Sequence, residues 1–370
     1  GDGRSMTARL ASIDLLRAIA IVSMVLVHFT ENLAGYTPPF AGVGAPLFVF
    51  LSGVSYFIWS ESLVAAGRGD TAITQTSVRR GLFIFAAGFA FNLFVWLPED
   101  IFNWDVLTLI GSALVLLAFM RHLPREVLLL VGAVLLLLAP VLRSMADYGQ
   151  YWENRYFECD LTISDVLIGY LVTGYFPLMP WLALSLFGYA TASRLFVQGP
   201  DGTGGGSGSL RVAATGLALV AVSVALLVVR PFLAGPVAAG LLGGWTMFPP
   251  TTEYMVGMLG AAMLSLGLAH RFVDPLAQAG RLPRLVGIAR TMSQCSLTIY
   301  VVHHVVHLWP LWVYGYSETG EPTAHWMRAT SVGMSFALAG AFLLACIVVL
   351  RAIGSRRPFG LEALMRWVCD

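Results

Sequence analysis

Residues 12–31, SIDLLRAIAIVSMVLVHFTE, decide the fold class of this chain. The stretch is apolar enough to enter a bilayer, yet it carries Asp14 and Arg17 near its start and His28 and Glu31 near its end. Charged or titratable side chains on a spanning helix are costly, so they are usually paired, face a polar cavity or do chemistry. A helix rises about 1.5 Å per residue, which places Arg17 and His28 roughly 16 Å apart along the axis, about half of a hydrocarbon core. The stretch therefore predicts a spanning helix with one polar group toward each side of the membrane.

The composition of the whole chain extends this prediction to a polytopic membrane protein. Hydrophobic residues make up 57% and charged residues 12% of the 370 residues, and the mean hydropathy is +0.76, which does not fit a soluble domain of this size. No basic patch suited to nucleic acid is present, and the four cysteines lack metal-ligand spacing. We expect an all-α bundle of about ten transmembrane helices, forming a single domain over residues 9–367.

Ten apolar runs are long enough to cross a bilayer. They cover residues 13–29, 43–60, 80–97, 104–120, 127–142, 176–196, 210–229, 254–270, 293–311 and 330–350. We expect a short helix at 163–175 and an interfacial or re-entrant segment at 232–245. The glycine-rich and serine-rich stretch 198–209 predicts a flexible cytoplasmic loop.

The arginines predict the orientation of the bundle. With a cytoplasmic N-terminus and ten spans, eighteen arginines fall on the inner side and four on the outer side. This positive-inside bias predicts that both termini are cytoplasmic. We expect the protein in the inner or plasma membrane of the cell. The long outer loops at 30–42, 143–165 and 315–328 mix aromatic with polar residues, as expected of an acceptor-binding vestibule.

The outer end of the first span carries a candidate catalytic pair. The His28 imidazole titrates near neutral pH and can take a proton from an attacking hydroxyl or amine as a general base. Glu31 follows one helical turn later and is a candidate to orient His28. An interfacial histidine that anchors the helix is the structural alternative.

The inner end carries candidate donor-binding arginines. Arg17, Arg79 and Arg80 would form a basic mouth of the kind that a phosphate-rich cofactor needs. Two plainer explanations stay open, because Arg17 and Asp14 share a helix face and can pair locally, and because the positive-inside bias alone produces such a cluster.

A second group of candidates lies on the ninth predicted span. The run SLTIYVVHHVVHLW contains His303, His304 and His307, which we expect on the outer half of the helix at the level of His28. Histidines at this spacing can bind zinc or haem, but no third-ligand motif is visible. We therefore expect no metal and assign these histidines, with Asn92, to the acceptor side of the cavity; interfacial belt residues are the alternative.

Several segments, in order, resemble known transmembrane acyltransferases. Arg17, ten intervening residues and His28 resemble the first span of acyltransferase-3 proteins. RRGLFIFAAGFAFNLFVW and FNWDVLTLIGSALVLLAF, followed by YFPLMPWLALSLFGYA, are similar to segments of bacterial proteins like heparan-alpha-glucosaminide N-acetyltransferase. The ending RPFGLEALMRW is similar to that of YeiB-type proteins.

The resemblance implies transfer of an acyl group, usually acetyl, from cytoplasmic acetyl-CoA to a sugar on the far side of the membrane. It implies that Arg17 belongs to the donor side and that His28 is the catalytic histidine. The lysosomal enzyme of this group differs, because it has asparagine at the position of His28 and its histidine in the next loop, where this chain has Pro38 and Pro39.

We therefore expect an acetyl-CoA-dependent O- or N-acetyltransferase that acts on a hydroxyl or amine of a glycan or glycolipid. Its other expected partners are membrane lipids and a second copy of the chain in a homodimer. Direct transfer and an acetyl-histidine intermediate both fit. A transporter or flippase of a polar lipid or sugar, with Asp14, Arg17 and His28 as a relay, is the alternative. A haem-binding redox protein is a third hypothesis, which predicts a Soret band.

Overall fold

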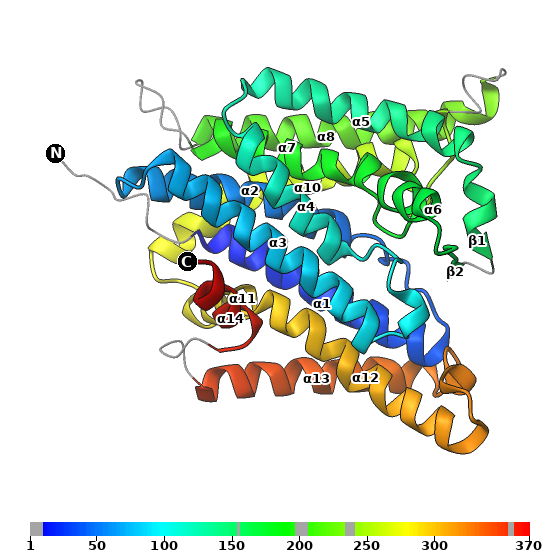
Figure 1. The fold of residues 1–370 in the computed structure, drawn as a ribbon. Helices are drawn as coiled ribbons and strands as arrows, with labels where there is room; N and C mark the ends of the chain where they lie inside the picture. The colour runs from blue at the N-terminus through cyan, green and yellow to red at the C-terminus, as the bar shows by residue number, and fades with distance from the viewer. Residues whose placement is uncertain (1–9, 154–155, 197–205, 234–240, 354–358) are drawn as a thin grey trace.

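The protein is an almost entirely helical bundle, seen here in a computed structural model that describes residues 10–153, 156–196, 206–233, 241–353 and 359–370 (Figure 1). The helices of these ranges are α1 (Ala11–Ala34), α2 (Gly44–Ala65), α3 (Asp70–Phe94), α4 (Val106–Met120), α5 (Arg125–Met145), α6 (Ile163–Ile168), α7 (Leu178–Phe196), α8 (Gly206–Val229), α10 (Thr252–Gln278), α11 (Pro283–Gln294), α12 (Ser296–Thr319), α13 (Val332–Ile353) and α14 (Leu361–Cys369).

Short elements connect these helices on one side of the bundle. Two-residue strands β1 (Trp152–Glu153) and β2 (Tyr156–Phe157) pair antiparallel. Single turns of 3₁₀-helix or π-helix lie at Pro98–Asp100, Tyr148–Tyr151, Gly169–Thr173, Arg230–Phe232 and Pro322–His325. The described part of the chain is thus an all-α fold with one minimal hairpin, as the sequence predicts.

The count of spans depends on two bends. Seven described helices are long and apolar enough to cross a membrane, and the number rises to nine if each of two bent pairs is one span. One pair joins residues 163–173 to α7 at 42°, and the other joins α11 to α12 at 76°. All ten predicted segments correspond to helices, but the segment predicted at 104–120 is the short helix α4, of 15 residues.

The largest difference from the predicted boundaries is at the start of α3, and two predicted segments lie partly outside the described residues. Helix α3 begins at Asp70, ten residues before the predicted 80, because its first turns are polar and carry no hydropathy signal. Of the predicted flexible loop 198–209, residues 198–205 lie outside the described residues and residues 206–209 already belong to α8. Within the segment 232–245, residues 234–240 likewise lie outside them.

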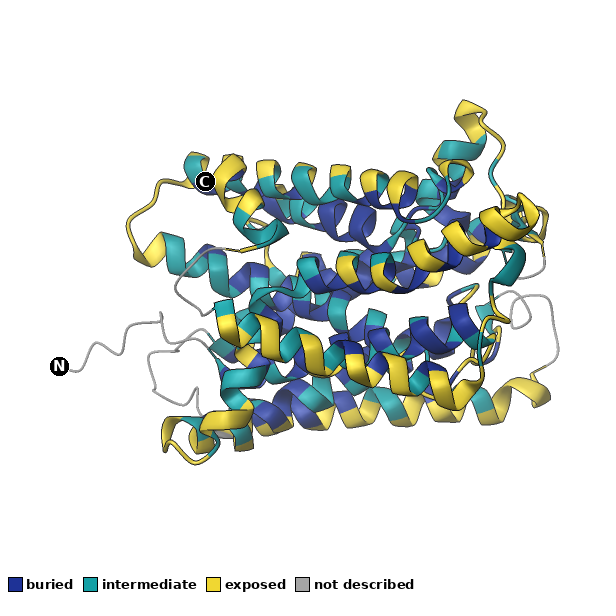
Figure 2. Cartoon of the chain, turned by 90° about the horizontal axis from the view of Figure 1, so that it is seen from below, coloured by how far each residue is buried: buried dark blue, intermediate teal, exposed yellow. Residues whose placement is uncertain are grey.

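Helix α1 lies at the centre of the bundle. It contacts α2, α10, α11, α12 and α13, and Figure 1 shows α12 and α13 on one side of it and α5, α7 and α8 on the other. Buried residues gather along the middle of the helices and exposed residues on their outer faces (Figure 2). The central position explains why the polar residues of α1 have protein neighbours on several sides.

Glycines allow the closest helix contacts. A Cβ atom on Gly53 of α2 would lie 1.9 Å from the Ser185 carbonyl oxygen, and one on Gly188 of α7 would lie 2.1 Å from the Phe50 carbonyl oxygen. The backbones of α2 and α7 therefore touch directly, which is how helices gain packing energy in a membrane, where the lipid is as apolar as the side chains.

The C-terminal helix α14 fixes the start of α12. The Glu362 carboxylate accepts hydrogen bonds from the backbone N–H groups of Leu297 (2.6 Å) and Thr298 (3.2 Å), both in the first turn of α12. It thereby satisfies donors that a helix N-terminus leaves free. At the other end of α14, Asp370 accepts from Nε of Arg80 on α3 at 2.8 Å. These contacts support the part of α12 that follows the sharp bend.

Candidate functional site

Four histidines from two helices meet beside the C-terminal half of α1. The Nδ1 atom of His28 lies 2.9 Å from Nε2 of His303 on α12. The His28 ring centroid is 4.5 Å from that of His304, and the His303 and His304 centroids are 4.0 Å apart. His307 lies one turn further along, with its ring centroid 5.5 Å from that of His304. The structure thus brings His28 together with three histidines that follow it by about 275 residues in the sequence.

Backbone carbonyls set the tautomers of the three α12 histidines. The Nδ1 atoms of His303, His304 and His307 lie 2.9, 3.0 and 2.6 Å from the carbonyl oxygens of Ile299, Tyr300 and His303. A carbonyl oxygen can only accept, so each Nδ1 carries the proton and, in the neutral ring, each Nε2 carries the lone pair.

This assignment fixes His28 as well. Because Nε2 of His303 is an acceptor, Nδ1 of His28 must be the donor in the bond between them. The lone pair of neutral His28 then lies on Nε2, which has no hydrogen-bond partner among the described residues. His28 is half-buried, whereas His303, His304 and His307 are 0, 2 and 5% exposed. Of the four, His28 therefore combines the greatest access with a free basic nitrogen.

Asn32, which the sequence analysis did not single out, joins the cluster to a loop. Its amide nitrogen donates to Nε2 of His307 at 2.9 Å, and its side-chain oxygen accepts from the Trp326 indole at 3.1 Å. Asn32 follows His28 by four residues and so shares its helix face, which is the signal that could have identified it. Gly35 ends α1 with φ +64° and packs against the Met327 carbonyl, so the loop closes directly over Asn32.

Trp326 also belongs to a group of aromatic side chains next to the histidine cluster. The Trp326 ring lies 5.9 Å from the Tyr156 ring and 6.3 Å from the Trp96 ring, and Trp96 in turn lies 6.0 Å from His304. The Tyr156 hydroxyl donates to the buried carboxylate of Asp100. Burial raises the pKa of Asp100, while the hydrogen bonds from Tyr156 and Asn103 lower it. Two of the predicted vestibule loops, 143–165 and 315–328, therefore meet through Tyr156 and Trp326, and Trp96 joins them to His304.

A hydrogen bond from Tyr300 of α12 to Asp105, at the start of α4, supports the cluster from a second helix. The Tyr300 hydroxyl donates to Oδ1 of Asp105 at 2.5 Å, and Oδ2 of Asp105 caps α4 by accepting from the Leu107 N–H at 3.0 Å. Because His304 donates to the carbonyl of Tyr300, the Asp105 side chain helps to fix the turn of α12 from which His304 projects.

Two other candidates on this side make different contacts. The Glu31 carboxylate accepts a hydrogen bond from the Thr37 side chain, whereas the hydrogen bond of His28 within the described residues is with His303. Asn92 is 2% exposed, and its amide donates to the Ile101 carbonyl at 3.3 Å. The structure therefore places His303, rather than Glu31, in contact with His28.

The candidate donor arginines lie toward the opposite ends of the same helices. Arg17 is half-buried on α1, and Arg79 is exposed on α3. Arg80 is engaged with Asp370, and its guanidinium carbon lies 4.7 Å above the Trp59 ring. Of the two α3 arginines, Arg79 is thus the more accessible to a ligand from solution.

Three of the histidines also present nitrogen atoms in a group. Ligand atoms of His28, His303 and His304 all lie within 4.8 Å of one another, so a metal ion could be held between them. Against this, the His28 and His303 nitrogens share a proton at 2.9 Å, which a metal ion bound to both would have to displace. The sequence prediction of no metal stays a prediction.

The comparison with protein families identifies the chain. The model of the family described as heparan-alpha-glucosaminide N-acetyltransferase, catalytic, matches residues 9–215, which is more than half of the chain and includes Arg17 and His28. The α12 histidines lie outside the matched range. No curated protein matches the chain. The chain therefore belongs to the heparan-alpha-glucosaminide N-acetyltransferase catalytic family, whose activity is of the membrane acetyltransferase kind.

Proposed function

We propose that the protein transfers an acetyl group from cytoplasmic acetyl-CoA to a hydroxyl or amine of a sugar or glycolipid on the opposite side of the membrane, with His28 as general base. The observation that supports this most is the Nε2 atom of His28, which has no hydrogen-bond partner among the described residues and whose lone pair is fixed by the contact with His303. The family match supports the class of reaction, and the arginine distribution supports the orientation, with both termini cytoplasmic.

The chemistry asks little of the protein beyond placement and proton transfer. A thioester is already activated, so the site must bring it beside the acceptor and stabilise the oxyanion that forms. The acceptor oxygen or nitrogen attacks the thioester carbonyl carbon and gives its proton to Nε2 of His28. The tetrahedral intermediate then collapses, the bond from carbon to sulfur breaks, and the proton passes from His28 to the departing thiolate.

His303 supports the charged state of His28 in this proposal. When His28 holds two protons, its Nδ1–H donates to Nε2 of His303 as a charge-assisted hydrogen bond. His303 cannot turn away readily, because its own Nδ1 donates to the Ile299 carbonyl. His303 is therefore a positioning residue, and Glu31 remains the second candidate for that role.

The donor would approach from the Arg17 end of α1. Arg17, Arg79 and Arg80 are proposed to hold the phosphates of CoA, and the pantetheine arm would reach between the helices toward His28. Asn92, His303, His304 and His307 are proposed on the acceptor side, without a resident metal. A homodimer in the membrane is compatible with this arrangement.

The test is release of CoA from acetyl-CoA by the purified protein in lipid nanodiscs, with a panel of amino sugars and glycolipids as acceptors. His28→Ala should lower the rate by roughly 10²- to 10⁴-fold, the range typical of a general base, while acetyl-CoA still binds. His122→Ala is the matched control, because His122 is exposed and lies beside Asp70, which begins α3. Equal rates for His28→Ala and wild type would reject the assignment of the base.

A further inference from the structure

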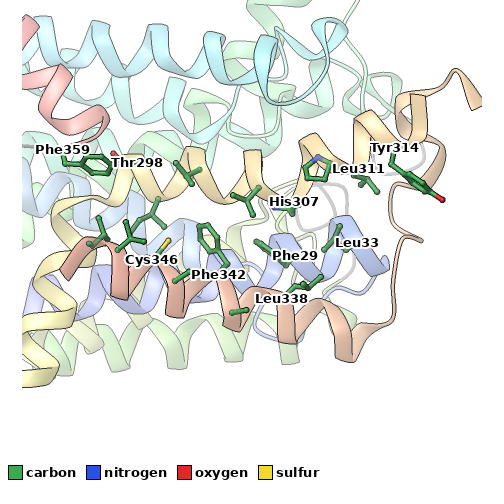
Figure 3. A pocket seen from close by; sticks show the side chains of 18 residues that line it. Phe29, Leu33, Thr298, His307, Leu311, Tyr314, Leu338, Phe342, Cys346 and Phe359 are labelled. Carbon is green, nitrogen blue, oxygen red and sulfur yellow. The ribbon is translucent and has the colours of Figure 1, made fainter. Parts of the chain in front are cut away.

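A long apolar groove runs beside the histidine cluster, between α12 and α13 (Figure 3). Its volume is about 850 Å³, within the range of pockets that hold small ligands. One wall includes Phe29 and His307, whose rings pack with centroids 4.6 Å apart. The groove is therefore separated from His28 by one layer of side chains.

The groove has the length of a lipid chain. On α12 it is lined by residues four apart, which occupy one face of the helix, from Thr298 through Val302, Val306 and Pro310 to Tyr314. Sixteen residues of helix extend about 24 Å, close to the thickness of a hydrocarbon core. The groove thus follows α12 across most of the membrane.

Among the described residues, the side chains that line the groove have no hydrogen-bond donor to spare beyond one thiol, so an amide carbonyl buried there would lack a strong donor. The Thr298 hydroxyl accepts from the Leu361 N–H at 2.9 Å and donates to Glu362. The Tyr314 hydroxyl donates to Glu318 at 2.7 Å. Both ring nitrogens of His307 are bonded, to Asn32 and to the His303 carbonyl. The remaining polar side chain is the free thiol of Cys346, a weak donor.

This chemistry distinguishes between two occupants. The pantetheine arm of acetyl-CoA contains two amides, and burying amides without partners is costly. A hydrocarbon chain has no groups to satisfy, and in a membrane it would enter the groove sideways from the lipid. The groove is therefore suited to a hydrocarbon chain and unsuited to the donor.

The position of the groove indicates which lipid supplies the hydrocarbon chain that it binds. One end opens at Leu33 and Tyr314, beside Glu318 in the last turn of α12 and the following loop, which carries His325 and Trp326. Trp326 donates to Asn32, which contacts His307. A lipid whose chain lies in the groove would present its headgroup at this loop, next to the aromatic vestibule and the histidines. An acceptor anchored in this way would deliver its hydroxyl or amine to the site.

We infer that the groove between α12 and α13 binds the hydrocarbon chain of the acceptor, and hence that the acceptor is a lipid-linked saccharide. The inference rests on the proposed acetyl transfer for the role of the bound lipid. The binding itself can be measured without any transfer, so the two can fail separately.

The experiment uses the full chain in phospholipid vesicles that contain a phospholipid with a photoactivatable diazirine on its acyl chain. Labelled peptides are mapped with and without n-dodecyl glucosaminide, and glucosamine serves as the acceptor without a chain. We expect labelling of α12 and α13 that n-dodecyl glucosaminide displaces and glucosamine does not. Ala345→Trp, which fills the groove from an exposed position, should abolish the displaceable labelling. Leu344→Trp is the control, since Leu344 is 64% exposed and does not line the groove.

The same variants are then compared in acetyl transfer. Ala345→Trp should raise the KM for n-dodecyl glucosaminide by about tenfold or more, the factor expected from losing the burial of about two methylene groups. Its KM for glucosamine should stay at the wild-type value. Labelling that n-dodecyl glucosaminide fails to displace would mean that ordinary membrane lipid fills the groove, and would overturn the inference. If wild type transfers acetyl to neither compound, the proposed function fails, and the displacement result alone decides whether the groove binds the glycolipid.

Discussion

The Nδ1 atom of His28 and the Nε2 atom of His303 share one proton at 2.9 Å, and the planes of the two rings are nearly parallel, with an angle of 4° between them. The direction of this hydrogen bond follows from the Ile299 carbonyl, which accepts from the other nitrogen of His303. One backbone carbonyl on α12 thus determines which nitrogen of His28, on a different helix, is basic. The geometry makes His303 the residue through which this control acts.

Replacing His303 should therefore slow the reaction without weakening donor binding. We expect His303→Ala to lower kcat by roughly 10- to 100-fold, because a hydrogen bond to a charged group contributes about 1.5 to 3 kcal/mol. The KM for acetyl-CoA should remain unchanged. His303→Gln should recover part of the rate, since its side-chain oxygen can still accept from Nδ1 of His28. Steady-state kinetics of both variants check this.

The rate of Glu31→Gln, compared with that of His303→Ala, tests whether Glu31 or His303 orients His28. If Glu31 orients His28, this variant will lose as much rate as His303→Ala. Equal losses in His303→Ala and His303→Gln, together with a lower melting temperature in both, would instead indicate that His303 acts through packing.

Hydropathy predicted the helices well because a span in a membrane must be a run of about 20 mostly apolar residues whose backbone hydrogen bonds are made within a helix. All ten apolar runs are helices, and the level of His303 along its span was predicted from the alternating direction of the helices. The rotation of each helix about its axis was not predictable, since nearly every face of these helices is apolar. The contact of His28 with His303 instead of Glu31, and the bridging role of Asn32, depend on that rotation. The 76° bend before α12 likewise has no hydropathy signal.

The two arginines of α3 should contribute unequally to the binding of acetyl-CoA. Arg79 is exposed, whereas Arg80 is engaged with Asp370 and Trp59. We expect Arg79→Ala to raise the KM for acetyl-CoA by about tenfold, the loss of one charge-assisted hydrogen bond to phosphate. Arg80→Ala should change that KM less and instead loosen α14, although the pair is partly exposed and contributes at most about 1 kcal/mol. Kinetics and limited proteolysis of the C-terminal segment distinguish the two; a larger KM effect in Arg80→Ala would contradict the assignment.

The contact between α2 and α7 should tolerate no added carbon at Gly188. Gly188→Ala would place a methyl group 2.1 Å from the Phe50 carbonyl oxygen, so the two backbones must separate. Overpacking of this kind costs about 1 to 3 kcal/mol, and the melting temperature in detergent should fall. Gly340→Ala on α13 is the matched control, because a Cβ there meets no atom within 4 Å and alanine favours a helix. A fall in melting temperature of the same size in both variants would show that the packing contact is not responsible.

Metal removal should leave the enzyme unchanged. A divalent ion between His28, His303 and His304 would bring two positive charges into a group of neutral imidazoles that contains no carboxylate, and would displace the proton shared by His28 and His303. Uncompensated charge in a membrane-embedded site is strongly unfavourable. We expect metal analysis of the purified protein to give far less than one equivalent of zinc, copper, nickel or iron, and dialysis against a chelator to leave acetyl transfer intact. The contrary result would be one equivalent of bound metal that the chelator removes together with the activity and that His304→Ala does not bind. That result would contradict the general-base mechanism and indicate a metal-bound nucleophile or Lewis acid.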